Sequence, residues 1–148
     1  MPAPEPAHRV AFSCGLWFAY GRAKRPEVTA STTFEAVLRG ERTSTTRFAR
    51  WPGHEAWLRV LPGDLIRFHE FKDRSGRTAV VRVSSVIPIS LCSCCEAEIE
   101  VWSRCEGWSP ERGRALGREL GPALWFRHGE PIWPAREAPP VPAQGSLF

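Results

Sequence analysis

One short segment of the sequence combines cationic and hydroxyl side chains at close spacing. Residues 40–47, GERTSTTR, place two Arg and four hydroxyl side chains directly after a glycine. Guanidinium groups and hydroxyls bind phosphate oxygens and the edges of bases, so this segment is a candidate nucleic-acid contact. The alternative interpretation is an exposed strand, in which Thr and Arg are common.

A second candidate is the carboxylate of Glu106, which falls near the end of a predicted helix over residues 96–107. Trp102 and Cys105 belong to a broad apolar arc on that helix, and Glu106 lies at the edge of the arc. A carboxylate in that place is partly desolvated and requires a cation or a hydrogen-bond donor. Because Gly107 follows directly, the alternative is a residue at the end of the helix that turns into water.

Tryptophan is frequent, with seven residues in the chain. Aromatic rings beside a cationic pocket stack on bases, whereas elsewhere large aromatic side chains fill cores. Trp108 follows a glycine, and we expect it to be open for stacking. We expect Trp102, inside the apolar arc, and Trp125, in an apolar strand, to be core residues.

The cysteines offer one Cys-x-x-Cys spacing, formed by Cys92 and Cys95 in the run CSCC, with Cys105 further along. A structural zinc site needs four ligands, and here a second pair and a nearby His are missing. We therefore expect no metal and no cofactor. The clustered cysteines are predicted to be loop residues, and Cys105 is predicted to be part of the core.

The positive charge is concentrated near the N-terminus. The first 50 residues carry eight Arg or Lys and four Glu, so the net charge of +4 lies in that third of the chain. A basic loop there contains Arg22, Lys24 and Arg25. This distribution favours an anionic partner such as nucleic acid.

The elements that must position these residues alternate between strands and short helices, which is typical of an α+β domain or a small barrel. In chain order we predict a strand over 10–20, a helix capped by Thr32 and ended by Gly40, a strand within 41–47, strands over 65–71 and 77–86 joined by a loop at 73–76, a helix over 96–107, a helix capped by Ser109, and a strand over 123–128.

The length of 148 residues fits one domain with tails. Proline spacing predicts disordered tails over 1–8 and 129–148, which leaves a folded domain over 9–128. No apolar run is long enough to span a bilayer, and the first residues lack the charged start and apolar core of a secretory signal. We therefore expect a cytoplasmic protein without a membrane partner.

Three short elements in this order resemble the ASCH domain family. They are Gly-x-Arg-x-x-Thr-x-Arg at 40–47, the turn at 61–64 (LPGD) that leads into a strand, and the Val-rich strand that follows. The family usually opens with Gly-x-Lys-x-x-Thr-x-Arg before a Pro-Gly-Asp or Thr-Gly-Asp turn. The resemblance covers about residues 28–128. It implies an α+β fold, a small PUA-like antiparallel β-barrel with short flanking helices, related to an RNA-binding domain and found here in a bacterial protein.

The resemblance also implies an activity on nucleic acids or nucleosides. Some ASCH proteins are amidohydrolases that remove the acetyl group of N4-acetylcytidine with a Lys, a Thr and a Glu, and another branch is linked to ribonuclease activity. By resemblance Thr45 matches the Thr, Arg47 the trailing Arg and Glu106 the acidic residue. Arg42 stands where the family has Lys. In such a hydrolase Glu106 would be the base, Thr45 or a water the nucleophile, and Arg42 a fixed cation for the developing oxyanion.

One chemical and one geometric condition apply to a site made of Arg42, Thr45 and Glu106. Arginine keeps its proton at neutral pH, so a mechanism that needs a neutral amine in the place of Arg42 is not available. Arg42 and Thr45 are three residues apart and face opposite sides of a regular strand. They share a site only if Arg42 lies in the turn over 40–43.

The leading hypothesis is therefore an ASCH-like domain that binds RNA, other single-stranded nucleic acid, or a modified nucleobase or nucleoside in a cleft. The predicted binding residues are Arg22, Lys24, Arg25, Arg42, Thr45, Arg47 and Trp108, with Glu106 lining the same cleft. The first alternative is a hydrolase of modified nucleosides or RNA with Arg42, Thr45 and Glu106 as its catalytic residues. The second is a DNA adaptor that binds the bacterial sliding clamp through the C-terminal residues Gln144, Leu147 and Phe148.

The adaptor hypothesis predicts that a peptide of residues 139–148 binds sliding clamp. The final QGSLF matches the clamp-binding motif Gln-Leu-Ser/Asp-Leu-Phe at four of five positions, and two terminal apolar side chains can anchor a peptide in a groove. Gly145 replaces an apolar Leu, so we expect a Kd on the order of tens of micromolar or weaker. Titration of the labelled peptide against one with Leu147 and Phe148 changed to Ala measures it. Equal binding of the two peptides, or none, would remove the adaptor hypothesis.

Overall fold

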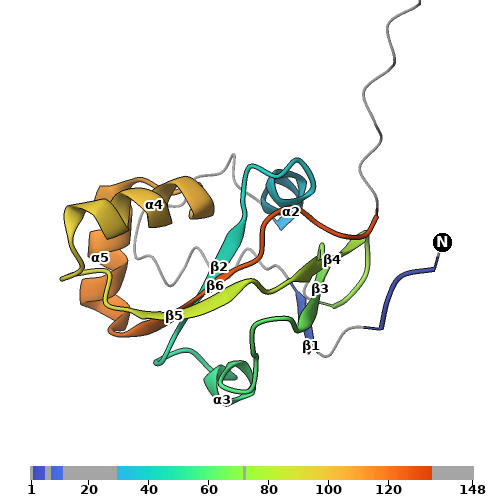
Figure 1. The fold of residues 1–148 in the computed structure, drawn as a ribbon, viewed down its shortest axis with the longest axis horizontal. Coiled ribbons are helices and arrows are strands. Elements are labelled where there is room, and N and C mark those ends of the chain that lie inside the picture. Colours follow the sequence, from blue (N-terminus) through green and yellow to red (C-terminus); the bar gives the residue numbers. More distant parts are fainter. Residues whose placement is uncertain (1, 6–7, 12–29, 72, 135–148) are drawn as a thin grey trace, which may run out of the picture.

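The structure, a computed structural model, describes residues 2–5, 8–11, 30–71 and 73–134 as a mixture of short strands and helices (Figure 1). The predicted α+β class is confirmed. The elements are β1 (His8–Ala11), α2 (Ala30–Leu38), β2 (Ser44–Phe48), α3 (His54–Trp57), β3 (Leu65–His69), β4 (Thr78–Arg82), β5 (Ser85–Ile89), α4 (Glu96–Glu106), α5 (Pro110–Leu120) and β6 (Ala123–Arg127).

The described strands form two three-stranded sheets, ordered β1-β3-β4 and β2-β6-β5. The β1–β3 pair is parallel and the other pairs are antiparallel. The chain passes from one sheet to the other between Val83, whose N–H donates to the Asp64 carbonyl at 2.9 Å, and Ser84, whose N–H donates to the Arg127 carbonyl at 2.7 Å. Closure of these sheets into the predicted barrel stays a prediction.

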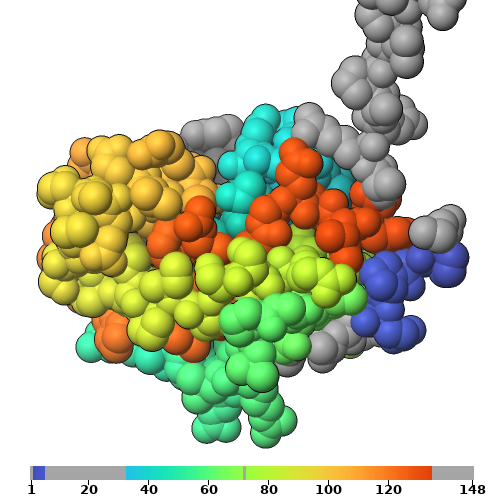
Figure 2. All heavy atoms as spheres, in the orientation of Figure 1, coloured from blue at the N-terminus to red at the C-terminus, as the bar shows by residue number. Residues whose placement is uncertain are grey.

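The sheet β2-β6-β5 is covered on both faces because its residues alternate between two hydrophobic cores. On β6, Phe126 belongs to a core shared with α2, β3 and β4, whereas Trp125 belongs to a core shared with α4 and α5. Figure 2 shows the α4–α5 pair, in yellow to orange, at one end of the molecule. The chain over β3 to β5, in green to yellow-green, leads from the other end toward it. Residues on opposite faces of β2 therefore meet different surroundings.

Several boundaries differ from the sequence-based expectation. The helix α2 begins at Ala30, two residues before the predicted cap position at Thr32. The predicted strand over 77–86 was wrong as one element, since β4 and β5 belong to different sheets. The sequence did not predict β5 as a separate strand, because it contains Pro88. The missing N–H of Pro88 is tolerated because β5 is an edge strand. The short helix α3 was not predicted. Of the predicted strand over 10–20, residues 12–20 lie outside the described residues.

The chain also stays in the fold beyond His128. The Ile132 N–H donates to the Val80 carbonyl at 2.8 Å, and the Val80 N–H donates to the Trp133 carbonyl at 2.7 Å. The predicted C-terminal tail from residue 129 therefore starts too early, and the described fold extends to residue 134. Of the predicted first tail, His8 belongs to β1, and residues 1, 6 and 7 lie outside the described residues, as do residues 135–148.

The close approach of α5 to the loop after β5 predicts that Gly117→Ala destabilises the fold. A Cβ at this position would overlap the Cys92 backbone nitrogen and lie 2.8 Å from the Leu91 carbonyl carbon. Backbone atoms cannot move far to relieve this overlap. We therefore expect the free energy of unfolding, measured in urea, to fall by about 1–3 kcal/mol, although Ala has a better helix propensity than Gly. The exposed neighbour Arg118→Ala is the control and should change stability little. Unchanged stability of Gly117→Ala would mean that α5 and this loop are not in contact.

Candidate functional site

Glu106 is the last residue of α4 and points into the core. The buried residues of α4 are Ile99, Trp102, Cys105 and Glu106, which follow the helical spacing of one face. Gly107 ends the helix in the left-handed conformation, with φ of 78°, and its N–H donates to the Ser103 carbonyl. The side chain of Glu106 is only 3% exposed. The alternative that it turns into water is therefore wrong.

Both oxygens of the Glu106 carboxylate accept hydrogen bonds from hydroxyls of β2. The Ser44 hydroxyl donates to Oε2, and the Thr46 hydroxyl donates to Oε1 at 3.0 Å. Each hydroxyl in turn accepts from an indole N–H: Trp125 donates to Ser44 at 2.8 Å, and Trp102 donates to Thr46 at 2.9 Å. An indole only donates, so these two relays fix both hydroxyl protons toward the carboxylate.

Arg42 reaches the same carboxylate from the turn before β2. The Thr43 N–H donates to the Cys105 carbonyl at 2.8 Å, which ties this turn to the end of α4. From there the Arg42 Nε donates to the Ser44 carbonyl at 3.2 Å, and Nη2 lies 3.6 Å from Glu106 Oε1. The Arg42 side chain is 10% exposed, so the ion pair is almost fully removed from water. The turn position is the one that the sequence required for Arg42 to reach a site.

Burial raises the pKa of Glu106 above its ordinary value, because a carboxylate loses hydration in the core. The Arg42 guanidinium and the Ser44 and Thr46 hydroxyls oppose this rise. The result is a carboxyl group whose proton affinity is increased beside the guanidinium of Arg42. Such a group can exchange a proton or hydrogen-bond a polar ligand, and perturbed carboxyls of this kind are concentrated at functional sites.

His128 lies next to Arg42 at the end of β6. Its backbone N–H donates to the Thr43 carbonyl at 2.9 Å, and its Nδ1 lies 2.8 Å from the Gly129 carbonyl oxygen. Its ring meets the Phe68 ring edge-on at a centroid distance of 5.4 Å. Burial, and to a smaller extent the Arg42 charge, lowers the pKa of His128 to about 4. The ring is therefore neutral at pH 7.

Comparisons with known proteins bear on the fold. No family model matches the sequence, and none of the curated proteins matches it. Solved structures do match: a point mutant of the ASCH protein of Zymomonas mobilis has a TM-score of 0.53 at 13% identity, over 90% of this chain and 77% of that one. A DUF984 protein of Enterococcus faecalis has a TM-score of 0.55 at 14% identity, over 94% and 89%. An ASCH domain of Lactobacillus crispatus has a TM-score of 0.51 at 15% identity, over 84% and 79%.

This chain has the ASCH fold. The resemblance in the sequence thus predicted the fold correctly. None of the helices in the described part of this ASCH fold is long and apolar enough to cross a membrane.

Within the ASCH fold, the predicted convergence of Thr45 with Arg42 and Glu106 is wrong. Ser44 and Thr46 face the carboxylate, so strand alternation turns Thr45 to the other face of the sheet, where its cross-strand partner is Phe126. Arg47 lies on that face as well, with its Cζ 4.4 Å from the centroid of the Trp57 ring. Two of the three predicted catalytic residues are thus in contact and the third is separated by the strand.

The remaining predicted residues are distributed as follows. Trp108 is half-buried against the α4–α5 core, and the Arg112 Cζ lies 6.0 Å from its ring centroid. Arg22, Lys24 and Arg25, and the tail residues Gln144, Leu147 and Phe148, lie outside the described residues. Cys105 is buried, as predicted. The described part of the chain contains no group of three His, Cys, Asp or Glu side chains that could hold a metal ion.

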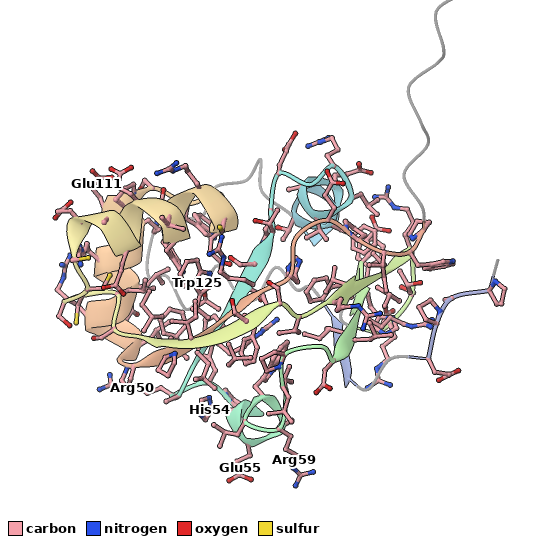
Figure 3. All side chains as sticks on the ribbon, in the orientation of Figure 1. Arg50, His54, Glu55, Arg59, Glu111 and Trp125 are labelled. Atoms are coloured by element: carbon pink, nitrogen blue, oxygen red, sulfur yellow. The ribbon has the colours of Figure 1, made fainter. Side chains whose placement is uncertain are left out.

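The residues that hold the carboxylate were not predicted from the sequence. Ser44 and Thr46 were seen only as members of a hydroxyl-rich segment, and Trp102 and Trp125 only as core residues. Figure 3 shows Trp125 amid the side chains beside β6, close to the α4–α5 end. The available signal was the i, i+2 spacing of Ser44 and Thr46, which puts two hydroxyls on one strand face.

The low pKa of His128 predicts a loss of stability in acid. An unfolded His titrates near pH 6.5 and the folded one near 4, so the unfolded chain takes up the proton first. The contribution of His128 is therefore fully present above pH 6.5 and is lost as the pH falls toward 4. His128→Asn should weaken this pH dependence, measured by urea unfolding between about pH 7 and pH 4.5. His54→Asn on α3 is the control (Figure 3). An unchanged dependence in His128→Asn would contradict the assignment.

Proposed function

We propose that this chain binds RNA, or a nucleobase or nucleoside, at a site built around Arg42 and Glu106. The observation that carries the proposal is the buried ion pair between these residues, with Nη2 and Oε1 3.6 Å apart. A buried ion pair is a weak source of stability, because desolvation of the two charges offsets their attraction. A buried pair whose own carboxyl group has a raised pKa is better explained by recognition of a polar ligand.

The chemistry of the pair suits nucleic-acid components. A guanidinium presents N–H donors in a fixed plane, which match the acceptors on base edges and on phosphates. A carboxyl group accepts from amino and imino groups of bases. The hydroxyl relays from Ser44 and Thr46 fix the orientation of Glu106, so a ligand meets a preorganised group.

The cationic N-terminal third supports a polyanionic ligand rather than an isolated small molecule. It holds eight Arg or Lys in 50 residues, and these include Arg22, Lys24 and Arg25. Cations of this kind bind phosphates without reading sequence, while the pair at Arg42 and Glu106 would read a base. The ASCH fold supports the family assignment. Because one fold hosts many functions, the ligand is inferred from the residues of this site.

The proposal predicts that Arg42→Gln and Glu106→Gln each weaken binding of single-stranded RNA by about tenfold or more, because each removes a charge-assisted hydrogen bond. Fluorescence anisotropy with a labelled oligonucleotide measures the affinity, and urea unfolding shows that the variants fold. Arg39→Gln is the matched control, since Arg39 is an exposed residue three positions earlier that pairs with Glu41. Equal affinity of all three variants would place binding elsewhere.

The basic segment gives a separate prediction. Changing Arg22, Lys24 and Arg25 to Glu should lower affinity for every RNA sequence and reduce the slope of log affinity against log salt, because fewer counterions are released. A salt titration of the wild type and the triple variant measures both effects. Unchanged binding would exclude this segment from the interface.

A hydrolase of modified nucleosides or RNA is the second candidate, favoured by the contact between the Ser44 hydroxyl and Glu106. A carboxylate that accepts from a hydroxyl is the arrangement of a general base and a nucleophile. Because Thr45 lies on the other face, the geometry favours Ser44 or a water as the nucleophile, with Glu106 as the base. Arg42 would then stabilise the developing oxyanion.

This candidate predicts that Arg42→Lys is not a conservative change. A Lys at the buried position can lose its proton and act as a base, so the variant should gain or raise deacetylation of N4-acetylcytidine. The wild type should be slow or inactive on the same substrate. Steady-state assays of both proteins, with Arg39→Lys as the control, measure it. Rapid turnover by the wild type would show that no titrating amine is needed at this position.

A further inference from the structure

One nitrogen of the His128 ring is buried without a hydrogen-bond partner. The residue is 6% exposed, and its Nε2 is among the buried polar atoms for which the structure gives no partner. Buried polar groups in folded proteins are almost always paired, so an exception calls for an explanation such as a ligand. The His128 N–H donates to the carbonyl of Thr43, the residue after Arg42, which relates His128 to the proposed binding site.

The hydrogen-bonding character of this nitrogen follows from its neighbours. The Gly129 carbonyl oxygen, 2.8 Å from Nδ1, can only accept, so Nδ1 carries the proton and donates. The ring is neutral at pH 7, because its pKa is lowered to about 4. Nε2 then has a lone pair and accepts. The missing partner is therefore a donor.

The surroundings restrict which donor can fit. The turn that carries Arg42 is bonded to the His128 backbone through Thr43, and the Phe68 ring lies edge-on to the His128 ring at 5.4 Å. An ionised phosphate has only acceptor oxygens toward a neutral ring nitrogen, and it would leave Nε2 unpaired. The pairing edge of a nucleobase instead carries an N–H donor beside an acceptor. It can donate to Nε2 and accept from Arg42 at the same time.

We propose that His128 Nε2 accepts a hydrogen bond from an N–H group on the pairing edge of a nucleobase, whose neighbouring acceptor is held by Arg42. This assignment rests on the proposed function and names the group that its site reads. It makes His128 a specificity residue of the site. It also predicts that the site binds a base more tightly than it binds a phosphate.

The test compares a nucleoside with its derivative that lacks the donor. Calorimetry identifies which of the four ribonucleosides binds best, and then measures its N-methylated derivative without the pairing-edge N–H. For the wild type we expect methylation to lower affinity about tenfold. His128→Asn keeps a donor toward the Gly129 carbonyl but has no acceptor at the Nε2 position, so it should bind both nucleosides equally. Inorganic phosphate should compete weakly.

Two further variants complete the design. His128→Gln restores an acceptor near the Nε2 position and should recover part of the discrimination. His54→Asn, on α3 among the labelled residues of Figure 3, should discriminate like the wild type. Urea unfolding of each variant shows that it is folded under the conditions of the binding experiment.

The outcomes separate this inference from the proposed function. A methylation penalty that persists in His128→Asn overturns the role of His128, as does phosphate binding as tight as that of the nucleosides. Binding of RNA without binding of any nucleoside also overturns it, while Arg42-dependent RNA binding still supports the proposed function. Absence of binding of both nucleosides and RNA would overturn both.

Discussion

The burial of the Glu106 carboxylate is the constraint on which the site depends. A charged or protonated carboxyl in a core must be supplied with partners, since its hydration is lost. Here the direct partners are two hydroxyls of β2 and the guanidinium of the turn before β2, and indoles of α4 and β6 hydrogen-bond the two hydroxyls. The carboxylate thereby couples the rotation of α4 to the position of β2 in its sheet.

The same constraint fixes the register of β2. Ser44 and Thr46 pair with Arg127 and Trp125 across the β2–β6 ladder, which brings each hydroxyl beside an indole or the carboxylate. A slip by one residue would turn Thr45 toward α4 and remove both hydroxyls from Glu106. The register decides which of the consecutive polar residues of β2 face Glu106, so it is as important for the site as the residue types.

Arg42 connects the two faces of that sheet. It lies in the turn before β2, where it contacts Glu106 on the side of α4 and acts electrostatically on His128 at the end of β6. Thr43 supports this position from its backbone, as its N–H bonds to Cys105 and its carbonyl accepts from His128. A cation in contact with a carboxyl of raised pKa, and near enough to a neutral imidazole to act on it electrostatically, brings donors and acceptors to one part of the fold. This is the chemistry that reading a base requires.

Local sequence patterns predicted the parts of the fold that depend on neighbours in the chain. The apolar period of residues 96–107 indicated α4, and the Ser109-Pro110 start indicated α5, whose first turn bonds to the Ser109 hydroxyl. The edge position of Glu106 on the apolar arc indicated a partly desolvated carboxylate, and it is buried. The elements that were missed, α3 and β5, are short, and the latter contains Pro88.

The sequence by itself determined the class of fold, because this follows from period, composition and turn residues. It also predicted a partly desolvated Glu106 and named a place in the turn over 40–43 as the condition for Arg42 to reach a site. By resemblance to a family motif, it named Thr45 or a water as the nucleophile. Only the tertiary structure decided that Ser44 and Thr46 face the carboxylate, that two indoles orient them, and that His128 lies beside Arg42. These contacts join residues far apart in the chain, up to 81 positions for Trp125 and Ser44. They depend on strand register and helix rotation, which local patterns do not contain.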